Sequence, residues 1–145
     1  MILEMIKHIT HNLILANETI RHFRRQNLHA ALGTMQTLTK GLITVVQSFM
    51  NEEELQAYGL DMDNFTVLLS GVMNAQENED YVLIADLLEL QIIPWLQQVQ
   101  ELLIANATFG MDEEQANYNL EGIRRCDASL AAKLETHVMP QEYVI

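Results

Sequence analysis

The amino-acid sequence predicts an all-α protein, an antiparallel bundle of four main helices with a C-terminal helical arm. Of its 145 residues, 49% are hydrophobic, which is enough to form a buried core. Glycine and proline number only six and two, too few for the turns that a sheet protein of this length would need. Apolar residues also recur at helical spacing through most of the chain. We therefore expect a helical bundle over residues 1–108 and an arm over residues 109–145 that packs on the bundle or projects from it.

Two long helices joined by a tight link are expected first. An apolar stripe with alternating steps of four and three predicts a helix over about residues 2–25. A second helix is predicted over about residues 28–50, where an a/d seam extends over three heptads. Because only Gln26 and Asn27 separate the two helices, they should form an antiparallel hairpin. The expected core residues of the second helix are Leu28, Ala31, Met35, Leu38, Leu42, Val45 and Phe49.

A short helix and then a third long helix should follow. Asn51 with the three glutamates after it is typical of a helix start, and Gly59 predicts the end of that helix. Either Asp61 or Asp63 then caps a helix over about residues 64–76. The expected buried face of this helix consists of Phe65, Leu68, Leu69, Val72 and Met73.

The fourth helix, over about residues 80–105, is apolar around nearly its whole circumference. A helix of this kind is either central in the fold or pairs with something outside it. Pro94 predicts a kink within the turn before it, because proline lacks the amide proton and its ring crowds that turn. Two apolar stripes are expected. The core stripe consists of Ala85, Leu88, Ile92, Trp95, Val99 and Leu102, and the second stripe consists of Leu83, Leu87 and Leu90.

The last helix of the sequence, from about residue 113, carries Leu130, Leu134 and Val138 at core spacing. The second stripe of the fourth helix needs a cover, since exposed apolar patches mark interaction sites. A tethered arm is the simplest cover. We expect the arm to dock partly over this stripe and to be displaced when a partner binds.

The charge of the chain is distributed unevenly and argues against nucleic acid as a partner. The net charge is −12, made up of +3 over residues 1–40 and −15 over residues 41–145. Most of this surface would repel a polyanion. The only basic cluster, Arg21, Arg24 and Arg25, is interpreted as favourable charge at the end of the first helix, with an anion site as the alternative.

The sequence favours a cytoplasmic location. Its single cysteine, Cys126, excludes an internal disulfide framework. The N-terminal stretch lacks the features of a signal peptide, and no uncharged apolar run approaches the ~20 residues of a membrane span.

No complete catalytic motif is present, so we expect neither enzymatic activity nor a cofactor. The alternative is a metal-binding bundle that uses Glu4, His8 and His11, which lie along one stripe of the first helix. Asp86 and Glu89 lie three residues apart in the apolar fourth helix. They are interpreted as its narrow solvent face, with acid–base chemistry as the alternative.

Parts of the sequence resemble known families. The stretch Asn78–Glu89, followed by Ile93-Pro-Trp-Leu, resembles a segment of small uncharacterised helical proteins of Gram-positive bacteria. The stretch Asn119–Ala131, with the ending Glu142-Tyr-Val-Ile, resembles the helical lead-in of motility-associated glycosyltransferases. The first 105 residues are similar in plan to flagellin export chaperones, small helical bundles that wrap the helices of a partner. These resemblances imply a motility-linked accessory role.

The leading prediction is therefore a non-enzymatic protein–protein interaction or chaperone-like protein that binds a partner helix through the fourth helix. A homodimer that covers the same apolar excess with its own interface is a further possibility. The expected partner-binding residues are Leu83, Leu87, Leu90 and Trp95.

Overall fold

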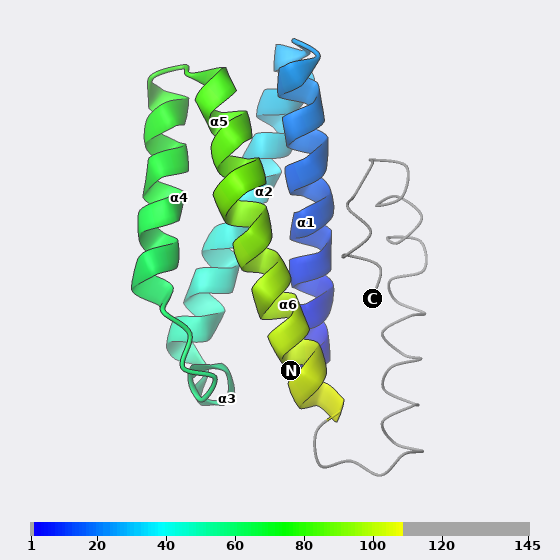
Figure 1. Cartoon of the computed structure of the whole chain (residues 1–145), viewed down its shortest axis with the longest axis vertical. Helices are drawn as coiled ribbons and strands as arrows, with labels where there is room; N and C mark the ends of the chain where they lie inside the picture. Colours follow the sequence, from blue (N-terminus) through cyan, green and yellow to red (C-terminus); the bar gives the residue numbers. More distant parts are fainter. Residues whose placement is uncertain (1, 109–145) are drawn as a thin grey trace.

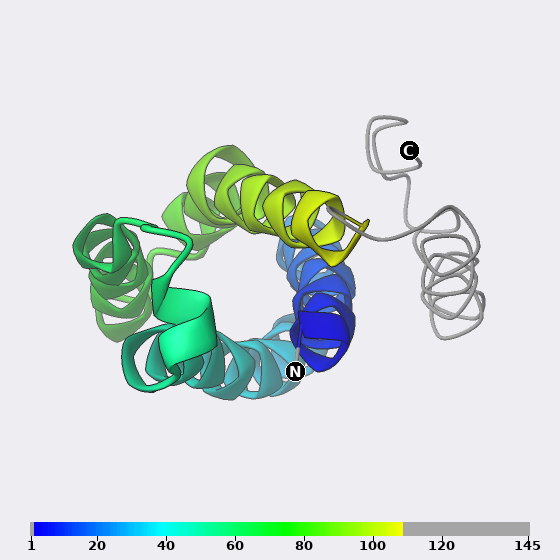
Figure 2. The ribbon, with the colours of Figure 1, turned by 90° about the horizontal axis from the view of Figure 1, so that it is seen from below.

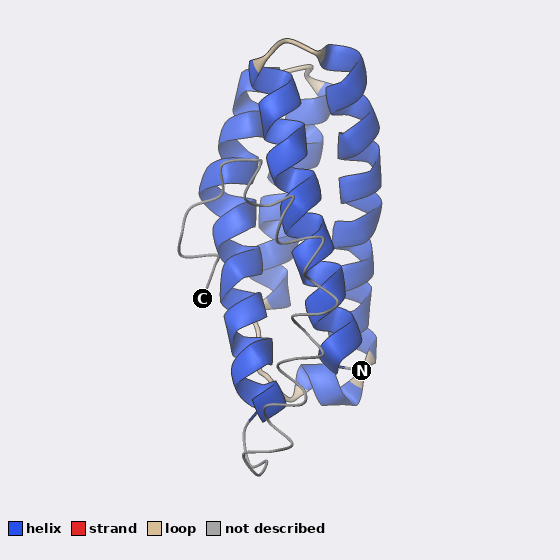
Figure 3. Ribbon diagram, turned by 90° about the vertical axis from the view of Figure 1, so that its right-hand side faces the viewer, coloured by secondary structure: helices blue, strands red, loops and turns tan. Residues whose placement is uncertain are grey.

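The computed structural model describes residues 2–108, and its long helices run alternately up and down around one core (Figures 1 and 2). Within these residues the regular structure is helical and contains no strand (Figure 3), so the predicted all-α class is confirmed. The predicted arm over residues 109–145 lies outside the described residues. The helices are α1 (Ile2–Arg24), α2 (Leu28–Asn51), α3 (Glu53–Gln56), α4 (Met62–Glu77), α5 (Tyr81–Leu87), η1 (Leu88–Ile92) and α6 (Ile93–Thr108).

The first hairpin supplies much of the core in the predicted phase. The apolar stripe of α1 is buried from Ile6 to Phe23, and the seam of α2 is buried from Ala31 to Phe49. Leu28 is the exception, because 40% of its surface is exposed. This residue begins α2 at the end of the bundle, beside the link, and no neighbouring turn covers it. Its assignment to the core was wrong.

Buried polar groups lie at the contacts of α1 with α2 and α6. Asn12 is fully buried and donates from Nδ2 to the carbonyl oxygen of His8 at 3.0 Å. A Cβ atom on Gly41 would lie only 2.1 Å from Oδ1 of Asn12, so α1 and α2 approach closely at this glycine. On another side of α1, Gln100 of α6 donates to the hydroxyl of Thr10 at 2.7 Å.

The α3–α4 region begins differently from the prediction. Asn51 is the last residue of α2, and Glu52 precedes α3 without a capping side-chain hydrogen bond, so the predicted helix start at Asn51 is corrected. Gly59 adopts a φ of +69°, as a glycine at a helix end can. Asp61 caps α4, since its Oδ1 accepts from the amide of Asn64 at 3.0 Å. Met73 is exposed rather than buried because it lies about 100° around the helix from the core-facing Val72.

The last long helix, made of α5, η1 and α6, departs from α geometry within the turn before Pro94. Leu88–Ile92 forms a π-helical turn, in which the amide of Ile93 donates to the carbonyl oxygen of Leu88, five residues earlier. The helix therefore continues past the proline with a widened turn. The most deeply buried side chains follow this altered phase, with Leu103 in the core in place of the predicted Leu102. They are Ile84, Leu88, Ile92, Leu96, Val99 and Leu103.

Candidate functional site

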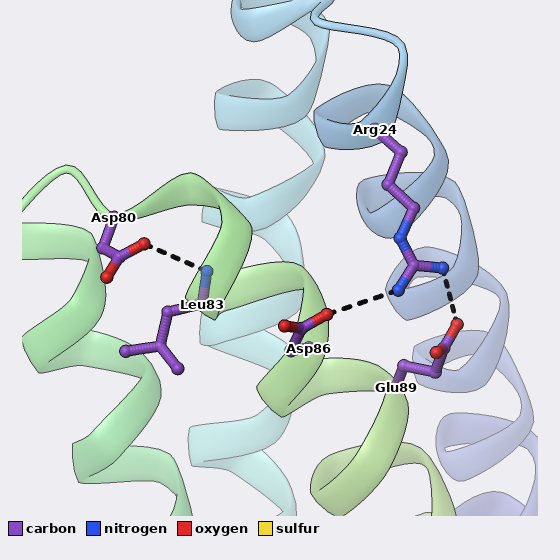
Figure 4. A network of polar contacts seen from close by, with 5 residues as sticks. All are labelled: Arg24, Asp80, Leu83, Asp86 and Glu89. Carbon is purple, nitrogen blue, oxygen red and sulfur yellow. Dashed lines mark hydrogen bonds and ion pairs between the residues drawn. The ribbon is translucent and has the colours of Figure 1, made fainter.

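The first half of the long helix made of α5, η1 and α6 carries two distinct flanks. The apolar flank consists of Leu83, Leu87 and Leu90, and the acidic flank consists of Asp86 and Glu89. Leu83 is 41% exposed and Leu90 is 69% exposed, while Leu87 between them is partly buried against the core. Figure 4 shows Leu83 on the side of α5 nearest α4, whereas Asp86 and Glu89 extend toward α1. Three of the four predicted partner-binding residues therefore lie together on one helix, with carboxylates beside them.

Arg24, at the end of α1, joins the acidic flank to the rest of the bundle. Its Nη1 donates to Glu89 Oε2 at 2.6 Å, and its Nη2 lies 3.6 Å from Asp86 Oδ1 (Figure 4). This hydrogen bond lowers the pKa of the Glu89 carboxyl and raises the pKa of Arg24. Both carboxylates are about half exposed, so they lie on the solvent face of the helix as predicted, but they share that face with Leu83 and Leu90. A lowered pKa keeps Glu89 ionised at neutral pH and does not suit a general acid.

A hollow of about 530 Å³ opens between the α1–α2 link and the beginning of α5. The rings of Phe23 and Tyr81 stack there, with centroids 5.5 Å apart and an interplanar angle of 15°. This size is in the range of pockets that take a small molecule or a large side chain. The lining residues are Phe23, Arg24, Gln26, Leu28, Tyr81, Val82, Ala85 and Asp86.

Trp95 is not part of this exposed surface. Only 9% of its surface is accessible, and its ring stacks on Phe65 of α4 with centroids 3.8 Å apart. Its assignment to the partner-binding residues is therefore corrected. The tryptophan belongs to the core stripe, because its position after the π-turn directs it at α4.

The alternative metal site does not come together in the described part of the chain. Within residues 2–108, no three histidine, cysteine or acidic side chains are placed to hold one ion. His8 Nε2 donates to the carbonyl oxygen of Gly41 at 3.1 Å, and Glu4 lies 3.5 Å from Lys7 Nζ. His11 is on the solvent side of α1, away from both.

Length and composition alone would allow the 26 residues Tyr81–Asn106 to cross a membrane, with a hydropathy of 1.3 in the most apolar window. The core helix of a bundle passes the same test, and 39% of that window is buried inside this one. Leu83 and Leu90 supply part of the exposed remainder. This helix is therefore distinguished by apolar side chains that are not buried in the core.

Sequence reasoning missed two features of the site. The pairing of Arg24 with Asp86 and Glu89 joins residues more than 60 positions apart. The stack of Phe23 on Tyr81 spans a similar separation. Local spacing carries no signal for contacts of this kind, although a basic helix end and an acidic flank on another helix are complementary in charge.

The bundle and its site fall within a known family. Residues 2–102 match the family described as "Domain of unknown function (DUF8042)". The chain belongs to this family. No curated protein and no solved structure matches the chain. The DUF8042 range includes α1 to α5, η1 and most of α6, and therefore every residue of the hollow and of the apolar flank.

Proposed function

We propose that this DUF8042 protein is a non-enzymatic interaction module that binds a helix of a partner protein along α5 and η1. The observation that carries the proposal is the exposure of Leu83 and Leu90. Both lie on a helix whose core positions, such as Leu88 and Leu96, are completely buried. The core positions of this helix are therefore filled, and two further leucines remain exposed to solvent.

The spacing of the apolar flank suits a helical partner. Leu83, Leu87 and Leu90 follow one another at steps of four and three, so they form a ridge along one side of the helix. A partner helix that packs on this ridge would present its own residues at the same spacing. Complete burial of a leucine side chain is worth about 1.5–3 kcal/mol, so the two exposed leucines offer a substantial driving force.

The hollow beside the α1–α2 link can add specificity. Val82 lies next to Leu83 and lines the hollow, together with Leu28. Interfaces typically concentrate their binding energy on a few large side chains that fill such pockets. We therefore include the hollow in the proposed surface. The resemblance of the sequence to flagellin export chaperones supports a motility-linked accessory role as part of this proposal.

Site-specific photo-crosslinking in cells tests the proposal. A photoreactive amino acid replaces Leu90 in one variant and Met50 of α2, itself 59% exposed, in a matched control. We expect a crosslinked product with a second protein from position 90 and none of that mass from position 50. A product containing two copies of this chain would replace the proposal with the homodimer. A folded variant that yields no product at position 90 would contradict both.

A further inference from the structure

We propose that the partner segment is a cationic amphipathic helix, with lysine or arginine beside its apolar stripe. This inference rests on the proposed function and assigns the chemistry of the partner. It follows from the charge that surrounds the exposed leucines and from the way in which the bundle already binds a guanidinium there.

The α4–α5 side of the bundle offers only negative charge of its own. Residues 41–108 contain no lysine, arginine or histidine. This range begins in α2 and includes the whole of α4, α5 and η1. Seven carboxylates lie between the N-cap of α4 and Glu89, namely Asp61, Asp63, Glu77, Glu79, Asp80, Asp86 and Glu89.

Three of these carboxylates, Asp80, Asp86 and Glu89, lie close to the apolar flank. Asp80 immediately precedes α5 and accepts from the amide of Leu83 at 3.1 Å (Figure 4), and Glu89 directly precedes Leu90 in the sequence. A helix seated on the leucines would therefore have acidic groups along its edge for two turns. Cations on its flank would be attracted, and anions would be repelled.

Arg24 shows that a guanidinium fits the acidic flank. It contacts Glu89 at 2.6 Å and Asp86 at 3.6 Å, yet both carboxylates keep about half of their surface exposed. One cation facing two anions leaves this group with a net negative charge. The flank can therefore take a further cationic side chain from outside the bundle.

The same charges disfavour a second copy of the chain as the occupant. An isologous dimer through this face would place the acidic flank of one copy near that of the other. Each chain carries a net charge of −12, so long-range repulsion adds to the local one. A cationic partner avoids both the repulsion between the acidic flanks and the long-range repulsion between the two chains.

Binding of designed peptides to the full chain tests the inference. The first probe is a helical peptide with leucines at steps of three and four and lysines on both edges of that stripe. The second has glutamine in place of every lysine. We expect the lysine peptide to bind at least about tenfold more tightly at low salt and to lose this advantage at high salt.

Two protein variants separate docking from general attraction between opposite charges. Leu83→Gln with Leu90→Gln keeps every charge and should weaken binding of the lysine peptide by about tenfold or more. Glu53→Gln with Glu54→Gln removes two exposed acids at the opposite end of the bundle and should leave it nearly unchanged. Circular dichroism verifies the fold of both variants.

The outcomes distinguish this inference from the proposed function. Equal binding of both peptides, lost in the leucine variant, would overturn the charge assignment and keep the apolar docking. Binding of the lysine peptide that ignores the leucine variant would overturn the docking surface. No binding of the lysine peptide, with a partner still crosslinked at Leu90, would overturn the charge assignment alone.

Discussion

Arg24 shows how a single exposed residue can connect distant parts of the sequence without contributing much stability. Its guanidinium holds Asp86 and Glu89 in one geometry, but all three side chains are about half exposed. Exposed ion pairs are worth about 0–1 kcal/mol, since solvent and salt screen them. The value of the contact therefore lies in orienting the acidic flank.

The Arg24 contact should be visible in the pH dependence of stability. The pKa of Glu89 is lowered from 4.5 by its hydrogen bond with Arg24, so this carboxylate stabilises the fold above its ordinary pKa. That contribution is lost as the pH falls through the lowered pKa. Arg24→Gln should cost up to about 1 kcal/mol at pH 7 and clearly less once Glu89 is protonated. Denaturant unfolding of both proteins at several pH values, with NMR titration of Glu89, measures this. A cost that is equal at pH 7 and at pH 2 would contradict the assignment.

Gly41 is the residue whose side chain the fold excludes. A Cβ there would lie 2.1 Å from Asn12 Oδ1, and Asn12 is fully buried at the α1–α2 contact. Gly41→Ala should destabilise the protein by about 1–3 kcal/mol through overpacking. Gly33→Ala is the matched control in the same helix, because nothing lies within 4 Å of its Cβ, and it should stabilise by about 0.5–1 kcal/mol.

A second substitution identifies the cause of the Gly41 effect. Asn12→Ala removes the amide that the new methyl group would meet, so in that background Gly41→Ala should cost clearly less. Thermal or denaturant unfolding of the four proteins gives the coupling energy. Additive costs of the two substitutions would show that Asn12 is not the obstacle.

At the scale of the element, the π-turn explains how one helix serves the whole length of the core. Ile84, Leu88, Ile92 and Leu96 are fully buried and follow at steps of four. In a regular α-helix each such step rotates about 40° beyond a full turn, so three steps would carry the stripe about 120° away from the core. The extra residue in the turn Leu88–Ile92 removes most of this drift.

Deleting a residue tests the π-turn directly. Removal of the exposed Gln91, with Pro94→Ala to remove the steric obstacle, should convert the segment to regular α-helix and keep the core in phase. Removal of Gln98, also exposed, in the same background should rotate Val99 and Leu103 about 100° out of the core and cost several kcal/mol. Thermal melts compare the two. Equal destabilisation would show that the π-turn does not absorb the extra residue.

The sequence is informative where periodicity governs and silent where distant segments meet. The spans of the long helices and the stripes of α1 and α2 follow from local spacing, and the structure confirms them except at Leu28. The exposed leucines of the second stripe were also predictable from their phase. The choice of Leu103 over Leu102 was not, because nothing local predicts a π-turn. The hollow was also missed, because one side of it comes from the α1–α2 link and its flanking residues and the other side comes from α5.

At the scale of the whole molecule, the net negative charge destabilises the folded state. A net charge of −12 on 145 residues produces self-repulsion that opposes the compact state. Added sodium chloride should therefore raise the melting temperature up to about 0.5 M, in contrast to a protein held by surface ion pairs. A variant with Glu77→Gln and Glu79→Gln should melt higher at low salt and gain less from salt. A melting temperature that falls with salt would contradict this.

The stack of Phe65 on Trp95 gives the molecule an internal optical probe. Helix α4 packs mainly on α5, η1 and α2 and reaches α6 through the Phe65–Trp95 stack, whereas α1 packs on α2, α5, η1 and α6. Local opening of the native state should therefore begin with the detachment of α4. The amides of α4 should exchange with deuterium sooner than those of α1. Such an opening would part the two rings and admit water to the single tryptophan of the chain. Fluorescence emission from that one indole would then report the loosening of a helix before the bundle as a whole unfolds.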